Sequence, residues 1–162
     1  MTFISEERYA DIIRVFPVLC VDIILKNRNG EYLLLKRKND PKKGSWWPVG
    51  GRVLKGETLE EAAIRKAKEE TGLSVRKPQP VGYFELFSER GPFDTPPGYH
   101  TVSIVFSASV DDQEKVTLDG QSARWKYAGE LPADFQVIPF HSSGVTSSPG
   151  RVKGVPDRRR ET

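Results

Sequence analysis

Two adjacent carboxylates and a lysine, Glu69, Glu70 and Lys66, carry the clearest chemical signal in the sequence. At about 100° per residue, they continue the apolar face of a predicted helix, which starts with Leu59, Ala62 and Ala63. The paired glycines Gly50 and Gly51 precede this helix, and they let a bound group approach the backbone closely. Carboxylates beside exposed backbone oxygens suit Mg²⁺, which binds a few carboxylates together with substrate phosphates. A helix end that simply leaves the core is the alternative explanation.

The segment Gly51–Leu73, GRVLKGETLEEAAIRKAKEETGL, resembles the signature of the Nudix hydrolases. That signature reads glycine, five residues, glutamate, seven residues, Arg-Glu, an aliphatic residue, any residue, Glu-Glu, any residue, glycine and an aliphatic residue. The residues that match at the required spacing are Gly51, Glu57, Arg65, Ala67, Glu69, Glu70, Gly72 and Leu73. A pattern this long is specific, so the chain is identified as a member of the family, with a likeness from roughly Pro17 to Leu131.

The resemblance implies an α/β (α+β) fold, the Nudix fold, in which a mixed β-sheet lies in an α/β/α sandwich. It also implies a hydrolase of nucleoside diphosphates linked to another group, with Mg²⁺, or Mn²⁺, as cofactor. One position departs from the signature, because Lys66 stands where the family has a glutamate that is commonly a metal ligand. A lysine does not bind a cation, and it neutralises part of the charge of Glu70 one turn away. We therefore expect one bound ion rather than two or three; the stricter alternative is that catalysis is lost.

Features outside the signature resemble the GDP-mannose mannosyl hydrolases, a subgroup that also lacks the second residue of the Arg-Glu pair. These features are Asp22, Lys36-Arg37, the Trp46/Trp47 loop, Gly51-Arg52-Val53 and Gln121 with Arg124-Trp125. By position, the resemblance implies a metal site formed by Gly50 through its carbonyl and by Glu69, Glu70 and Gln121. It implies that Arg37 and Arg52 hold the diphosphate and that Asp22 contacts the sugar. Trp46 and Trp47 are candidates for stacking on the nucleobase, with packing under the loop as the alternative.

The general base is not identified by this resemblance. The subgroup has a histidine directly after the glutamine, whereas this chain has Ser122, and a serine is not a base near neutral pH. His100, which follows a long Pro/Gly-rich loop, is a candidate catalytic residue, and a structural histidine is the alternative. Glu69, Glu89 or Asp94 are further candidates, and any of them would favour attack of water on phosphorus rather than on the sugar carbon.

Three functions follow from these residues. The main hypothesis is a Mg²⁺-dependent hydrolase of a nucleoside diphosphate sugar similar to GDP-mannose, which releases nucleoside diphosphate and sugar. The alternative enzyme is a pyrophosphatase that attacks phosphorus in ADP-ribose or in a nucleoside triphosphate. The third hypothesis, an inactive nucleotide-binding module, depends on Lys66 and Ser122. The subgroup also favours a homodimer.

The predicted elements alternate between strand and helix patterns. A capping box of Thr58 and Glu61 starts the signature helix, and Gly72 ends it. A second helix is expected from Ser5 to about Arg14, with Ser5 as its N-cap. The predicted strands are 18–26, 31–38, 81–88, 99–110 and 124–127, and 39–51 is predicted to be a loop dense in Pro, Gly and Lys.

Length and composition fit one globular domain. The chain has 162 residues, of which 37% are hydrophobic and 29% charged. No run approaches the roughly 18 apolar residues of a membrane span. A single cysteine, Cys20, excludes an internal disulfide framework and suits a reducing compartment, so we expect a cytoplasmic protein.

The charge is unevenly distributed along the chain. The net charge is +3, and its excess of Lys and Arg lies in the Ser-, Gly- and Pro-rich segment after residue 140. We therefore predict a Nudix hydrolase domain over 1–140 and a disordered basic tail over 141–162. The neutral folded part is poorly suited to nucleic acid, so a small nucleotide is the expected partner.

Overall fold

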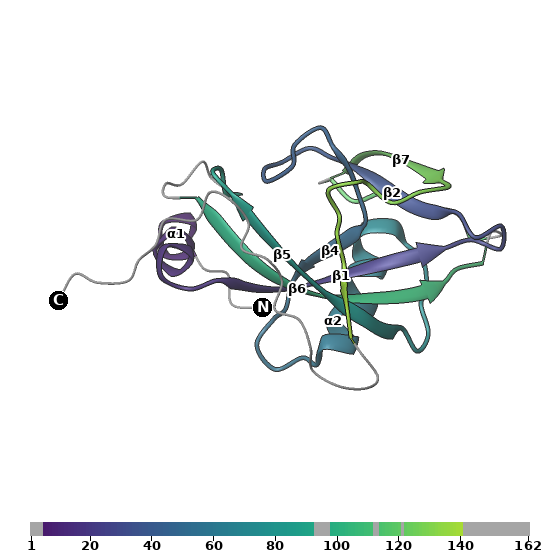
Figure 1. Ribbon diagram of the computed structural model, residues 1–162, viewed down its shortest axis with the longest axis horizontal. Coiled ribbons are helices and arrows are strands. Elements are labelled where there is room, and N and C mark those ends of the chain that lie inside the picture. The colour runs from purple at the N-terminus through teal and green to yellow at the C-terminus, as the bar shows by residue number, and fades with distance from the viewer. Residues whose placement is uncertain (1–4, 93–97, 112–113, 121, 141–162) are drawn as a thin grey trace.

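The structure, a computed structural model, describes residues 5–92, 98–111, 114–120 and 122–140 (Figure 1). In these ranges it has two helices, α1 (Glu6–Val15) and α2 (Leu59–Thr71), and eight strands. The strands are β1 (Val18–Lys26), β2 (Tyr32–Arg37), β3 (Trp46–Trp47), β4 (Val49–Arg52), β5 (Gln79–Ser88), β6 (Tyr99–Ser109), β7 (Ser122–Ala128) and β8 (Ile138–Pro139). The predicted α/β class is confirmed.

The sheet is mixed, with β1 at its centre. Its strand order is β3-β2-β1-β6-β5-β8, while β4 pairs with β1 and β7 pairs with β2. The pair β1–β6 is parallel and the other pairs are antiparallel. Within this register Asp22 of β1 lies beside Gly50 of β4 and Val105 of β6, so the sheet itself brings the paired glycines to Asp22.

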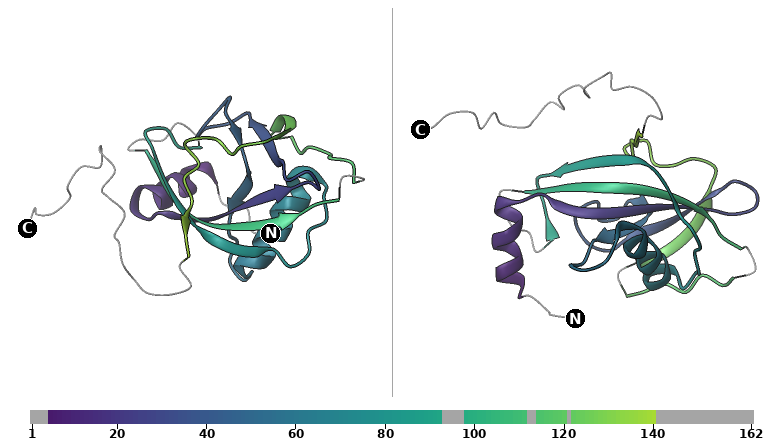
Figure 2. Two further views of the ribbon diagram at one scale, coloured as in Figure 1. Left: turned by 45° about the vertical axis from the view of Figure 1, so that its right-hand side comes forward. Right: turned by 90° about the horizontal axis from the view of Figure 1, so that it is seen from below.

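Helix α2 packs on one face of the sheet, as the views in Figures 1 and 2 show. Its ends follow the prediction, since the capping box of Thr58 and Glu61 is present and Gly72 adopts the left-handed conformation at φ 73°. Three small residues, Ala62, Ala63 and Ala67, are fully buried against the apolar side chains of β1 and β2. This close packing fixes the following turn, with Lys66 and Glu70, against the sheet.

Helix α1 lies at one end of the long strands, which is clearest in the right-hand view of Figure 2. Ser5 caps its N-terminus as predicted, accepting a hydrogen bond from the backbone of Arg8. Tyr9 and Ile13 pack on the start of β1 and on Tyr99 of β6. The Tyr9 and Tyr99 hydroxyls are 3.1 Å apart, so this contact joins α1 to the sheet by a hydrogen bond as well as by apolar packing.

A second apolar cluster forms around β3, β5 and β6. It consists of Ile24, Trp47, Phe84, Val105 and Phe135. The Trp47 and Phe135 rings meet edge to face with centroids 5.2 Å apart. The segment that contains Phe135 therefore packs on the sheet at Trp47 of β3 and Phe84 of β5.

The prediction of a continuous loop over 39–51 is wrong, because β3 and most of β4 lie within it. These strands form because their backbones pair with β2 and β1, a tertiary effect that overrides the local preference of Gly and Pro for turns. The short strand β8 was not predicted either. The predicted tail over 141–162 lies outside the described residues. In the described chain, neither helix is long and apolar enough to cross a membrane.

Candidate active site

A cleft of about 610 Å³ opens between β1, β2, β4, β6 and the C-terminal half of α2. Six of the predicted site residues line it: Asp22, Arg37, Trp47, Gly50, Arg52 and Glu70. They come from four strands and one helix, so the fold gathers groups that lie far apart in the sequence. The predicted residues Trp46, Glu69 and His100 are not among those that line the cleft.

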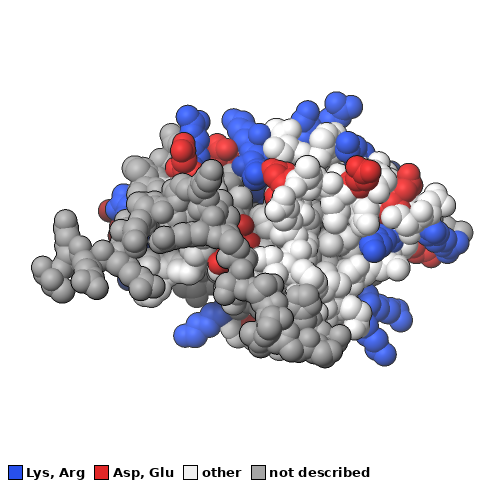
Figure 3. Space-filling model, in the orientation of Figure 1, with Lys and Arg blue, Asp and Glu red and all other residues white. Residues whose placement is uncertain are grey.

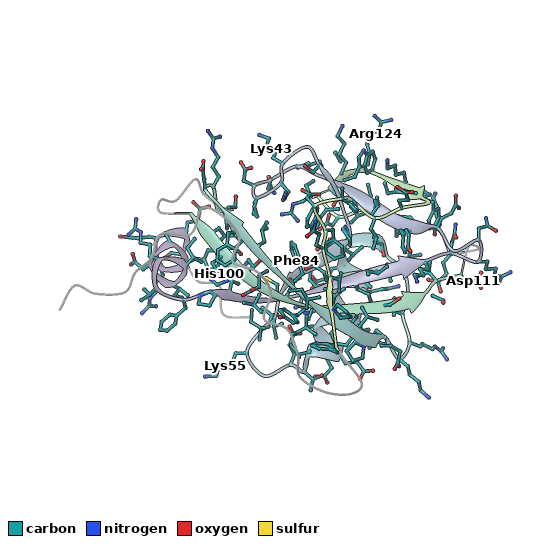
Figure 4. All side chains as sticks on the ribbon, in the orientation of Figure 1. Lys43, Lys55, Phe84, His100, Asp111 and Arg124 are labelled. Carbon is teal, nitrogen blue, oxygen red and sulfur yellow. The ribbon has the colours of Figure 1, made fainter. Side chains whose placement is uncertain are left out.

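Positive charge dominates the lining. Among the described residues, its basic residues are Arg37, Lys38, Lys42, Lys43, Arg52 and Lys66, and its acidic residues are Asp22, Asp40 and Glu70. Lys43 lies on the segment between β2 and β3, where Figure 4 labels it. Lys and Arg side chains also gather along the upper edge of the face in Figure 3, over this part of the fold. A cleft with this charge attracts polyanions.

Glu70 and Lys66 form a buried ion pair at the cleft. Lys66 Nζ lies 2.7 Å from Glu70 Oε1, and the two side chains are 11% and 12% exposed. Burial raises the pKa of Glu70, while the Lys66 ammonium acts in the opposite direction. Lys66, which replaces the signature glutamate, thus directly compensates the charge of the predicted metal ligand.

Glu69 belongs to a different network on the outer side of α2. Its carboxylate lies 3.0 Å from Arg65 Nη1 and 3.4 Å from Lys66 Nζ. Arg65 also binds both carboxylate oxygens of Glu57, and its Nη2 donates to the backbone carbonyl of Arg52. The hydrogen bonds from Arg65 to Glu57 hold the pKa of Glu57 below its usual range. Arg65 and Glu57 therefore fix the loop before α2, and the base predicted at Glu69 is away from the cleft.

The paired glycines admit two side chains of the protein itself. A Cβ added to Gly50 would lie 2.3 Å from Asp22 Oδ1 and 2.7 Å from the Val21 carbonyl oxygen. A Cβ added to Gly51 would lie 2.7 Å from Lys66 Cε. Asp22 and Lys66 thus lie where side chains at positions 50 and 51 would be. Both glycines line the cleft, and the approach of a bound group to their backbone stays a prediction.

Asp22 is a buried carboxylate that lines the cleft. Its residue is 7% exposed, and in the described part of the chain no Lys or Arg forms a salt bridge with it. Burial raises the pKa of Asp22 to about 6, against the opposing effects of hydrogen bonds from Ser103 and Trp47 and of the charge of Arg37. Asp22 is therefore poised to exchange a proton near neutral pH.

The two predicted phosphate-binding arginines are held differently. Arg37 Nε donates to the carbonyl oxygen of Pro41 at 2.8 Å, which orients its guanidinium on the cleft wall. Arg52 is exposed, and its guanidinium lies 4.4 Å from the centroid of the Tyr9 ring. Arg37 thus has a fixed position, whereas Arg52 stacks on α1 at the outer end of the cleft.

The two tryptophans separate because neighbouring residues of a strand point in opposite directions. Trp47 is 4% exposed and packs in the apolar cluster, so the prediction that it stacks on a base is not supported. Trp46 lies outside the cleft, with Lys36 and Lys126 over its ring at 5.9 Å and 4.6 Å. Its ring already contacts the protein's own cations.

His100 does not reach the cleft, so its predicted catalytic role is not supported. Tyr99, Thr101 and Ser103 of β6 line the cleft, and the alternation of the strand turns His100 the other way. Its ring stacks on Phe87 with centroids 4.2 Å apart, and Nε2 lies 3.8 Å from Glu85 Oε1. Figure 4 shows His100 nearer α1 than the labelled Phe84, which lines the cleft. Glu89 does not line the cleft either.

The predicted ligand set for Mg²⁺ is not assembled in the described residues. No group of three or more His, Cys, Asp and Glu side chains in these ranges could hold a metal ion. Glu70 is bound by Lys66, and Glu69 is bound by Arg65. Gln121 and the candidate base Asp94 lie outside the described residues. Of the predicted ligands, Gly50 and Glu70 line the cleft and Glu69 does not. The full ligand set and the dependence on Mg²⁺ or Mn²⁺ stay predictions.

Sequence reasoning missed Thr101 and Ser103, two buried polar residues of the cleft. The signal was available, because hydroxyl residues at alternate positions interrupt an otherwise apolar strand. What the sequence lacks is the register of β6 on β1, which pairs Ser103 with Cys20 and so brings its hydroxyl within hydrogen-bond reach of Asp22.

The comparison with protein families decides the identity of this fold. A model of the NUDIX domain matches residues 17–141. The chain belongs to the Nudix family. It is accordingly a Nudix-type hydrolase, and the Nudix identification made from Gly51–Leu73 is confirmed.

Two relatives of this Nudix protein carry different names. It is 31% identical over 125 residues to the low-salt glycan biosynthesis protein Agl8 of Haloferax volcanii, covering 77% of this chain and 79% of that protein. It is 39% identical over 117 residues to an ADP-ribose pyrophosphatase of Methanocaldococcus jannaschii, covering 72% and 65%. Neither name mentions GDP-mannose, so the predicted subgroup is not shown.

Solved structures confirm the Nudix fold. A MutT NUDIX hydrolase from Burkholderia pseudomallei superposes with a TM-score of 0.61 at 22% identity, covering 74% of this chain and 93% of that one. The mixed sheet and the two helices described above are therefore a Nudix arrangement.

Proposed function

We propose that this Nudix protein is a pyrophosphatase: it hydrolyses a nucleoside diphosphate derivative such as ADP-ribose by attack of water on phosphorus. The observation that carries the proposal is the composition of the cleft, which has six basic residues, buried carboxylates and, in the described residues, no histidine. The subgroup that attacks the sugar carbon uses a histidine where Ser122 lines this cleft. The 39% identity to an ADP-ribose pyrophosphatase also supports it.

The chain's own residues supply binding and proton transfer in this proposal. Arg37 and Arg52 hold the diphosphate, because guanidinium groups form strong charge-assisted hydrogen bonds with phosphate oxygens. Asp22 takes the proton of the attacking water, in place of the bases considered from sequence. A carboxylate with a pKa of about 6 is largely ionised at pH 8 and is still basic enough to accept that proton.

A nucleoside diphosphate sugar is the second candidate substrate. The similarity to a glycan biosynthesis protein, at 31% identity over 79% of that protein's length, favours it. Asp22 would then contact the sugar, as first expected, and water would attack carbon. This reaction leaves nucleoside diphosphate intact, whereas the proposed reaction gives two phosphomonoesters.

Product analysis by ³¹P NMR tests the proposal. The purified protein is incubated with ADP-ribose, ADP-glucose, GDP-mannose and ATP, each with Mg²⁺, with Mn²⁺ and with EDTA. We expect AMP and ribose 5-phosphate from ADP-ribose, and a rate that falls below pH about 6 as Asp22 becomes protonated. Release of GDP and mannose would instead support the second candidate, and no turnover of any compound would support the inactive binding module.

A further inference from the structure

Lys66 keeps one hydrogen-bond donor available at the cleft. An ammonium group has three N–H donors. In the described residues, Lys66 Nζ has two partners, Glu70 Oε1 at 2.7 Å and Glu69 Oε2 at 3.4 Å. Because Lys66 also lines the cleft, the third donor is available to an oxygen of a bound molecule.

The path of the Lys66 side chain depends on Gly51. A Cβ at position 51 would lie 2.7 Å from Lys66 Cε, 3.2 Å from Cδ and 3.3 Å from Nζ. The lysine therefore crosses the bare backbone of Gly51 before it reaches Glu70. A Cβ at position 51 would therefore require the end of the Lys66 side chain to move.

A purely structural ion pair explains this arrangement less well. Burying two charges costs solvation energy, and apolar residues of similar volume often replace such pairs without loss of stability. This pair faces a cleft that also contains Arg37 and Arg52. Its position therefore favours a role in binding an anion.

We propose that Lys66 is a substrate-binding cation, whose ammonium bridges Glu70 and the diphosphate of the bound nucleotide. It takes the place of a divalent ion that the signature glutamate would help to hold. This inference rests on the proposed function, because it takes the diphosphate as its ligand. Two consequences follow: the protein binds a diphosphate without divalent ions, and removal of Lys66 exposes Glu70 to them.

Isothermal titration calorimetry with ADP, AMP and adenosine in EDTA tests the first consequence. The wild-type protein is expected to bind ADP more tightly than AMP. The variant Lys66→Met should bind ADP about tenfold to hundredfold more weakly, the effect of one charge-assisted hydrogen bond, with adenosine binding unchanged. Lys55→Met is the matched control, because Lys55 is exposed on the loop before α2 and does not line the cleft (Figure 4).

Electron paramagnetic resonance of free Mn²⁺ tests the second consequence without any substrate. At pH 8, Lys66→Met should bind Mn²⁺ at least about tenfold more tightly than the wild type, because a positive charge beside Glu70 is gone. The double variant Lys66→Met/Glu70→Gln should lose this gain. An unchanged Mn²⁺ affinity in Lys66→Met would contradict the inference.

The variant Gly51→Ala addresses the same question if Lys66→Met does not fold. It keeps the lysine but displaces its ammonium, so it should weaken ADP binding in EDTA while the circular dichroism spectrum stays unchanged. Wild-type protein that binds ADP no better than AMP in EDTA would overturn the inference. The ³¹P assay remains independent, since turnover of ADP-ribose by the wild-type protein would keep the pyrophosphatase even where the titrations in EDTA reject the role of Lys66.

Discussion

Glu69 and Glu70 are neighbours on α2, yet they have different environments. The Glu69 side chain is 44% exposed and joins the Arg65–Glu57 network outside the cleft. The Glu70 side chain is 12% exposed, lines the cleft and pairs with Lys66. The difference shows that the faces of one helix separate two adjacent signature carboxylates, one bound to Arg65 outside the cleft and one that lines the cleft.

Glu70→Gln should have the largest effect on turnover. The variant removes the charge that holds Lys66 and should lower kcat/KM for ADP-ribose by about a hundredfold or more, the size of effect seen when electrostatic stabilisation is lost. Steady-state assays with purified protein measure this change. Equal activity of Glu70→Gln and wild type would exclude Glu70 from the site.

Asp22→Asn extends the comparison to a carboxylate that forms no salt bridge with any described residue. Burial raises the pKa of Asp22 to about 6, so between about pH 4 and pH 6 the folded state holds a proton that the unfolded state has lost. The Asp22 contribution to the free energy of unfolding therefore falls as the pH rises through this window. In urea unfolding, the free energy of unfolding of Asp22→Asn minus that of the wild type should therefore rise by up to about 3 kcal/mol from pH 4 to pH 8. An identical difference at both pH values would refute the buried-charge assignment.

Arg65→Met should affect stability more than chemistry. It removes hydrogen bonds to Glu57, Glu69 and the Arg52 carbonyl, and it should lower the free energy of unfolding by about 1–3 kcal/mol. Urea unfolding measures the loss. If Arg65→Met loses substrate affinity while its free energy of unfolding stays close to that of the wild type, Arg65 belongs to the active site instead.

Glu69→Gln should have the smallest effect. The Glu69 side chain is 44% exposed, and ion pairs whose carboxylate is open to solvent contribute little. We expect kcat/KM to change by less than about threefold, against the hundredfold loss in Glu70→Gln. Equal losses in the two variants would remove the distinction between the two faces of the helix.

Much of the fold was predictable because its signals are local. The apolar run of β1, the capping box of Thr58 and Glu61 and the left-handed Gly72 depend on neighbouring residues alone. The strands β3 and β4 were missed because two or four residues form a strand only when a partner strand is present.

The site was predictable in its residue types and less so in its geometry. The pairing of Lys66 with Glu70 follows from their spacing on a helix. The position of His100 does not, because the sequence shows that β6 alternates but not which side faces the cleft. The passage of the Lys66 side chain across Gly51 was likewise not predictable, because it depends on the contact between β4 and α2.

The most direct test of the central claim is hydrolysis of ADP-ribose in H₂¹⁸O, followed by ³¹P NMR. A bound ¹⁸O shifts the signal of the phosphorus that carries it, so the spectrum identifies the atom that water attacks. We predict ¹⁸O in the phosphate of AMP or of ribose 5-phosphate, with turnover by Glu70→Gln lower by about a hundredfold or more. Products that carry no ¹⁸O on phosphorus, or a wild-type rate in Glu70→Gln, would contradict an attack on phosphorus at this site.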